Sequence, residues 1–145
     1  MGPILLATDG SASADAATDE AIDLAKKHHA QLLVACVARD VLSPGAVLGY
    51  GIAAAELQRA EREHVEDVLA EVVQRARRVG VEPSPLSLGG SPGAAICAAA
   101  ATEHASLVVC GSHGWSRLAQ AVRGSVSHYV LQHASQPVLV VHQAS

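Results

Sequence analysis

Five short strand-like runs alternate with longer helical segments along this chain, and that alternation constrains the fold more than any other feature. The runs occupy residues 3–8, 31–37, 82–88, 106–110 and 137–142, and the helical segments occupy 13–29, 53–79, 94–104 and 126–134. Aliphatic runs without polar alternation are typical of strands that are buried on both faces. Strands joined by helices have right-handed crossovers, so we predict an α/β fold with an open five-stranded parallel sheet and helices on both faces.

Two proline-containing segments add detail to this prediction. Residues 38–52 hold Pro44 and several glycines, and we predict that they form a long linker between the second strand and the next helix. Pro83 and Pro85 shorten the third strand and place it toward an edge of the sheet. Gly80 is expected to end the helix before it.

Length and composition indicate a single domain spanning residues 1–145. Apolar residues make up 50% of the chain, aromatic residues only 2%, and Phe is absent, so the core must be aliphatic. The formal net charge of −4 argues against a binder of nucleic acid or of membrane surfaces, because both are polyanions. Three cysteines without a CxxC pair, no basic leader and no membrane-length apolar run indicate a soluble, cytoplasmic protein.

The stretch from Leu107 to Ser125 carries the most informative motif. An aliphatic run stops at Gly111, Gly114 follows three positions later, and Gly124 and Ser125 come after nine further residues. A glycine lets a backbone N–H approach a phosphate where a Cβ would collide, and a helix N-terminus attracts anions. The joint spacing therefore favours a phosphate-binding loop, although each glycine alone could merely end a strand or begin a helix.

This spacing resembles that of the ATP-binding branch of the universal stress proteins, which carry it between their fourth strand and fourth helix. Gly90, Pro92 and Ile96 match a second pattern of the family, before the third helix. The resemblance implies the strand order 3-2-1-4-5 of a Rossmann-like fold similar to the adenine nucleotide alpha hydrolases. In that order the first and fourth strands are neighbours, which places Asp9 beside Gly111.

Asp9 follows the first strand, at the edge where open α/β sheets bind ligands. It could accept a hydrogen bond from a ribose or an adenine amino group, or Asp9 and Ser11 could only cap the next helix. The resemblance implies a nucleoside contact here, and a contact of the adenine with the backbone of Val37. The full predicted nucleotide-binding set is Thr8, Asp9, Gly10, Ser11, Val37, Gly111, Ser112, His113, Gly114, Gly124, Ser125 and Val126.

The ligand that the resemblance implies is ATP, or another adenine nucleotide, with Mg²⁺. Arg117 and Arg123 could neutralise its phosphates or could face solvent. Trp115 departs from the basic residue that the family has after the second glycine. No nucleophile paired with a base, no Walker lysine and no two-carboxylate metal site accompanies the loop, so we predict neither catalytic nor metal-ligating residues.

Two other motifs match known signatures without the context that these signatures need. Gly49, Gly51 and Ala54 satisfy the dinucleotide pattern GxGxxA, but no clean strand precedes them and no acidic residue closes a following strand.

The second of these motifs is a nucleophile elbow, GxSxG, centred on Ser91. A serine hydrolase needs a carboxylate and a histidine further along the chain, but Glu103 is the only acidic residue after Ser91. Ser91 as N-cap and Pro92 at the first helical position explain the same residues without chemistry.

The final strand, Pro137–His142, contains four consecutive aliphatic residues that would be an aggregation hazard at an open edge. Universal stress proteins commonly dimerise through this strand, so the resemblance implies a homodimer. We predict a binding and signalling module of the stress response. The alternatives are a slow ATPase or nucleotidyl-transfer enzyme on the same scaffold, and a structural dimer that binds no nucleotide.

Overall fold

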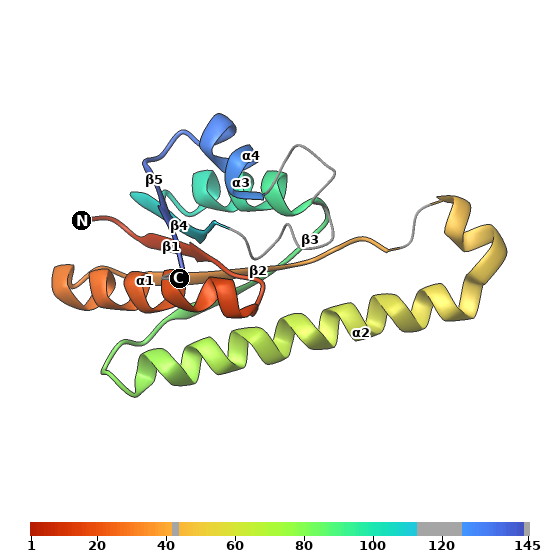
Figure 1. Ribbon diagram of the computed structural model, residues 1–145, viewed down its shortest axis with the longest axis horizontal. Coiled ribbons are helices and arrows are strands. Elements are labelled where there is room, and N and C mark those ends of the chain that lie inside the picture. Colours follow the sequence, from red (N-terminus) through yellow and green to blue (C-terminus); the bar gives the residue numbers. More distant parts are fainter. Residues whose placement is uncertain (42–43, 113–125, 144–145) are drawn as a thin grey trace.

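The five predicted strands form one parallel sheet in the order β3-β2-β1-β4-β5, which is the order that the resemblance implied (Figure 1). The structure is a computed structural model that describes residues 1–41, 44–112 and 126–143, with residues 44–52 described by their backbone only. The strands are β1 (Ile4–Ala7), β2 (Leu32–Ala38), β3 (Ser84–Gly89), β4 (Leu107–Gly111) and β5 (Val138–Val141). The helices are η1 (Ala12–Ala14), α1 (Asp15–His28), α2 (Pro44–Arg77), α3 (Pro92–Thr102) and α4 (Val126–His133).

β1 lies at the centre of the sheet between β2 and β4. Leu5 is in register with Leu33 on one side and with Val108 on the other. All four residues of β1 are fully buried, which explains why its sequence shows no polar alternation.

Helices cover both faces of the sheet, and each face has its own hydrophobic cluster. α1 and α2 lie on one face and α3 and α4 on the other (Figure 1). Alternate residues of each central strand belong to different clusters, so Leu6 packs toward α1 and α2 whereas Leu5 packs toward α3 and α4. Both clusters are built from aliphatic side chains and cysteine, as the composition, which lacks Phe, predicted.

The prediction of a linker from residue 38 to 52 is wrong. β2 continues to Ala38, and α2 begins at Pro44, so most of the expected linker is helical. A proline is well tolerated in the first turn of a helix, because its missing N–H has no partner there in any case. The early turns of α2 extend beyond the sheet at the end where β2 leaves it (Figure 1).

β3 occupies one edge of the sheet, as predicted from Pro83 and Pro85. The predicted end of this helix is also confirmed. α2 ends at Arg77, and Gly80, with a φ of +84°, donates its N–H to the Arg77 carbonyl in the turn that follows.

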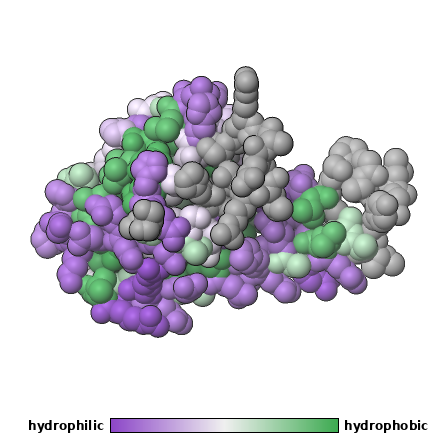
Figure 2. Space-filling model, viewed as in Figure 1, coloured by the Kyte–Doolittle hydropathy of each residue, from purple (hydrophilic) through white to green (hydrophobic). Residues whose placement is uncertain are grey.

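The outer side of α1 and α2 is mainly hydrophilic, as expected for helices that bury one stripe (Figure 2). Leu57 of α2 is an exception, with 61% of its surface exposed. Within the described ranges, the helices lack the long apolar stretch that crossing a bilayer requires.

Candidate functional site

β1 and β4 are neighbours at the switch point of the sheet, where the chain stops adding strands on one side of β1 and begins to add them on the other. The carboxyl ends of these two strands lie side by side. Ala7 is in register with Cys110, so the turn from Thr8 to Ser11 lies beside Gly111 and Ser112. The prediction that Asp9 lies beside Gly111 is therefore confirmed. This is the position at which open α/β sheets form a ligand-binding crevice.

The turn after β1 holds its carboxylate in a defined place. Asp9 Oδ1 accepts a hydrogen bond from the Ser11 N–H at 2.9 Å, and Thr8 Oγ1 accepts one from the Gly10 N–H at 3.2 Å. Asp9 thus closes a local Asx turn, while Ser11 occupies the N-cap position of η1 without a side-chain cap bond. The half-buried carboxylate keeps acceptor capacity for a ligand, because an ionised carboxylate accepts several hydrogen bonds.

Packing leaves no room for a Cβ at Gly10 and little room for one at Gly111. Gly10 has a φ of +78°, and a Cβ on it would lie 2.5 Å from Val68 Cγ2 of α2. A Cβ on Gly111 would lie 3.0 Å from the backbone oxygen of Ser13. The sequence predicted both glycines as ligand contacts, and the structure gives each a second reason to be glycine.

Two serine hydroxyls in this crevice lack partners. Ser11 Oγ and Ser112 Oγ are buried from solvent and have no hydrogen-bond partner among the residues that the structure describes. Ser112 also donates its backbone N–H to Val141 of β5, at 3.2 Å, which fixes its place in the sheet. Buried hydroxyls without partners are uncommon, and here one follows each of the two strands that meet at the crevice.

Val37 lies in β2 with 3% of its surface exposed, and its side chain is part of the hydrophobic core. Any ligand contact at this position must therefore involve the backbone, as the prediction stated. The preceding residue, Cys36, is equally buried, and burial raises the pKa of its thiol to about 12, with smaller contributions from the Asp9 and Glu61 carboxylates. Glu61 lies just beyond the end of β2, because its Oε1 accepts a hydrogen bond from the Arg39 N–H at 3.2 Å.

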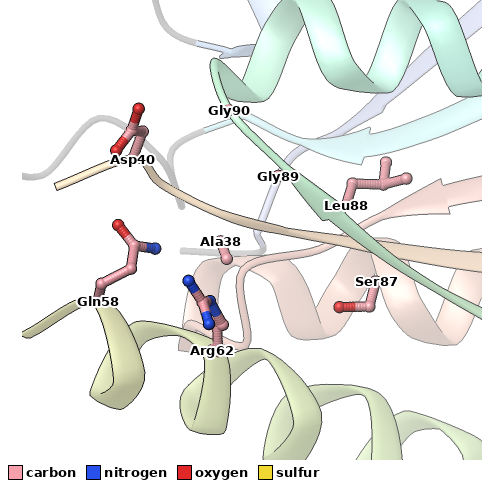
Figure 3. A pocket seen from close by; sticks show the side chains of 8 residues that line it. All are labelled: Ala38, Asp40, Gln58, Arg62, Ser87, Leu88, Gly89 and Gly90. Atoms are coloured by element: carbon pink, nitrogen blue, oxygen red, sulfur yellow. The ribbon is translucent and has the colours of Figure 1, made fainter. Parts of the chain in front are cut away.

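A cavity of about 420 Å³ opens beside this strand end, between α2 and the ends of β2 and β3 (Figure 3). Gln58 and Arg62 point into it from α2, and Ser87 points toward α2 from β3, whereas Leu88 points to the other side of the sheet. The lining residues are Ala38, Asp40, Gln58, Arg62, Ser87, Leu88, Gly89 and Gly90.

Sequence reasoning assigned no chemistry to α2 and missed these polar side chains. Gln58 is only 7% exposed and falls on the same helical stripe as the buried residues Ala54 and Val65. A polar residue at apolar spacing was the signal that could have identified it.

Four predicted site residues, His113, Gly114, Gly124 and Ser125, lie outside the described residues, as do Trp115, Arg117 and Arg123. Val126, the last of the predicted set, is the first residue of α4 and packs its side chain in the core. Only its backbone is therefore suitably placed for a ligand, at a helix N-terminus.

The two motifs without supporting context have ordinary structural places. Gly49 and Gly51 lie inside α2, so they do not form the turn between strand and helix that a dinucleotide site needs. Ser91 does follow β3 at the start of α3, in the N-cap position with Pro92 next, although without a side-chain cap bond.

Comparison with known proteins gives a consistent result over the whole chain. Residues 1–142 match the family model described as the universal stress protein family. The chain is 32% identical over 143 residues to the universal stress protein YxiE of Bacillus subtilis, a match covering 95% of this chain and 97% of that protein.

Solved structures agree with this match. The universal stress protein UspA from Lactobacillus plantarum superposes with a TM-score of 0.82 at 27% identity, covering 97% of both chains. A universal stress protein in complex with cAMP superposes with a TM-score of 0.72 at 26% identity, covering 99% of this chain and 98% of that one.

Proposed function

Because the chain belongs to the universal stress protein family, we propose that it binds an adenine nucleotide, ATP with Mg²⁺, and acts as a binding and signalling module. The nucleotide would lie across the carboxyl ends of β1, β2 and β4. Support for an adenine nucleotide comes from the similar universal stress protein that was solved in complex with cAMP.

The observation that carries the proposal is the pair of partnerless hydroxyls at the ends of β1 and β4. Leaving a buried hydroxyl without a hydrogen bond disfavours the free protein by about 1–3 kcal/mol. Ribose hydroxyls and phosphate oxygens could supply partners for both Ser11 and Ser112 once binding displaces the groups that exclude solvent from these oxygens, and the penalty would then be removed. The crevice of this chain therefore fits a ligand that is rich in oxygen.

The nucleotide's parts can be assigned along the sheet. We place the ribose and the adenine amino group near Asp9, and the adenine edge against the backbone of Val37. The phosphates extend toward the Gly111 turn and the backbone N–H of Val126 at the start of α4, where a helix N-terminus favours negative charge. Mg²⁺ commonly binds phosphates with few protein ligands, so it needs no cage of carboxylates here.

The test uses Ser11→Ala and Ser112→Ala, with the exposed Ser135→Ala as the matched control. Neither site variant removes a hydrogen bond that the described residues make, so each should keep or slightly raise the stability of the free protein. Each should also weaken Mg-ATP binding by about three- to ten-fold, the value of one hydrogen bond. Calorimetric titration and urea unfolding measure the two quantities, and unchanged affinity together with lost stability would contradict the proposal.

An enzymatic role remains the second candidate, as a slow ATPase or nucleotidyl-transfer enzyme. Phosphate release by the wild-type protein above that of a Gly124→Val variant would favour it. Release equal to that of the variant would favour the binding module. Failure of ATP, AMP and cAMP all to bind would favour a structural dimer without nucleotide.

We also propose that β5 pairs with its counterpart in a second copy. β5 ends the described sheet, pairs with β4, and leaves all four of its aliphatic residues only half-buried. Pairing removes such an open edge, which otherwise promotes aggregation. Light scattering should report the mass of a dimer at micromolar concentration, and a monomeric mass would contradict this arrangement.

We further propose that the protein works in the cytoplasm, because its three cysteines are free thiols, which a reducing compartment preserves.

A further inference from the structure

Two side chains of α2 hold the backbone that leaves β2. Gln58 Oε1 accepts a hydrogen bond from the Val41 N–H at 3.0 Å, and Gln58 Nε2 donates one to the Arg39 carbonyl at 3.1 Å. Glu61 Oε1 accepts a third from the Arg39 N–H at 3.2 Å. Figure 3 shows Gln58 directed from α2 toward the chain that carries Asp40. We call this arrangement the Gln58 clamp.

The clamp requires an amide in particular. Gln58 presents one donor and one acceptor to residues 39 and 41, as a peptide group of a neighbouring strand would. Glutamate at this position would lack the donor, and leucine would lack both groups. With Gln58 only 7% exposed, these bonds form away from water, where a lost partner is most costly.

The clamped segment is fixed from its other side by β3. The Gly90 N–H donates to the Ala38 carbonyl at 3.2 Å, so the end of β2 is held by both α2 and the turn after β3. Ala38, Asp40 and Gln58 together form one wall of the 420 Å³ cavity. The position of this wall therefore depends on the Gln58 clamp.

The order of the strands determines which end of a nucleotide meets this wall. β2 and β4 lie on opposite sides of β1. A nucleotide whose phosphates lie toward β4 and α4 consequently has its base toward β2. The clamped backbone begins two residues after Val37, at the base end.

We propose that Gln58 is a positioning residue that fixes the base-binding wall of the nucleotide site without touching the nucleotide. This inference rests on the proposed function, because it needs a bound adenine nucleotide. It adds a specific dependence, in which affinity for the base is set by an amide on α2.

The test compares Gln58→Ala with Gln74→Ala, an exposed glutamine on the same helix. Calorimetric titrations with ATP and with adenosine are made well below the melting temperature, so that every variant is folded. We expect Gln58→Ala to weaken both ligands by the same factor, about ten-fold or more, because the lesion acts on the base end that they share. Gln74→Ala should bind both ligands as the wild type does. Unchanged adenosine affinity in Gln58→Ala would overturn the proposal.

A second variant separates positioning from a general structural defect. In Gln58→Glu, the ionised side chain cannot donate to the Arg39 carbonyl, but the protonated one can. Adenosine affinity relative to the wild type should therefore recover as the pH falls from 8 toward about 5, since burial raises a carboxyl pKa. The charged groups that the described residues place around it are Arg39 and Glu61, which share the clamped segment, and Asp40 and Arg62, which line the same cavity. A deficit that stays constant with pH would overturn the positioning role.

A readout without ligand distinguishes the possible failures. Hydrogen exchange of the Val41 amide should be faster in Gln58→Ala than in the wild type, because its acceptor has gone. Faster exchange with unchanged adenosine affinity would make the clamp purely structural. Wild-type protein that binds no adenine nucleotide would overturn the proposed function and the positioning role together, and the Val41 exchange rate would still show whether the clamp exists.

Discussion

Replacing Gly10 by alanine is the sharpest test of how the β1 turn is built. The new Cβ would lie 2.5 Å from Val68 Cγ2, closer than real Cβ contacts, and the backbone φ of +78° is unfavourable for alanine. Val68 is 5% exposed and branched at Cβ, so it cannot easily rotate away. The β1 turn and α2 must therefore move apart.

The size of the effect follows from two contributions. A left-handed conformation disfavours alanine by about 1–2 kcal/mol, and overpacking a core contact adds about 1–3 kcal/mol. Gly10→Ala should thus lower the free energy of unfolding by about 2–5 kcal/mol. Gly80→Ala is the matched control, because Gly80 has a φ of +84° but no atom within 4 Å of the added Cβ, and so shows only the first contribution.

Urea unfolding followed by far-ultraviolet circular dichroism measures both variants. The double variant Gly10→Ala/Val68→Ala should be less destabilised than the sum of its single changes, because the smaller side chain removes the clash. Equal destabilisation by Gly10→Ala and Gly80→Ala would refute the packing argument. The glycine would then be explained by backbone conformation alone.

Three further predictions concern the same framework. Burial raises the pKa of Cys36 from 9.0 to about 12 and that of Cys110 from 9.0 to about 11, so the stability that the neutral thiols contribute should be complete well below pH 9 and fall as the pH rises above 9. Between pH 9 and 11 the slope is about 1.4 kcal/mol per pH unit for each thiol, and the Cys36→Ala variant should lack the Cys36 share of this slope in urea unfolding. Gly111→Ala should destabilise by about 1–3 kcal/mol, since its Cβ meets rigid backbone, and an unchanged urea midpoint would contradict this. Arg75→Ala breaks ion pairs of 3.1 Å to Asp15 and 2.7 Å to Asp19, but the exposed carboxylates limit the loss to about 1 kcal/mol, which high salt should reduce further.

The alternation of strands and helices could be predicted because it follows from local signals, whereas the strand order and the meeting of Asp9 with Gly111 were implied only by the resemblance to a known family. Aliphatic runs, helical spacing and a glycine motif are all readable in neighbouring residues. The start of α2 could not be read in this way, because the glycines after Pro44 are individually unfavourable in a helix, and only the helix as a whole compensates for them.

The packing role of Gly10 depends on a residue that is far from it in the sequence. Gly10 meets Val68 of α2, and this pairing exists only once the helix is packed on the sheet. Gln58 illustrates the same difficulty, since its partners at residues 39 and 41 precede it in another element. Its polar side chain on a buried stripe could be noticed, but its role could not be predicted from spacing alone.

The division of the core into two clusters has a consequence for cooperativity. Cluster members on opposite faces of the sheet, such as Leu6 and Leu5, are separated by the strand backbones. Gly10 packs against Val68 in one layer, whereas Val126 belongs to the other. A nucleotide held between the β1 turn and the start of α4 would contact both layers, so its binding would make their unfolding more nearly a single transition.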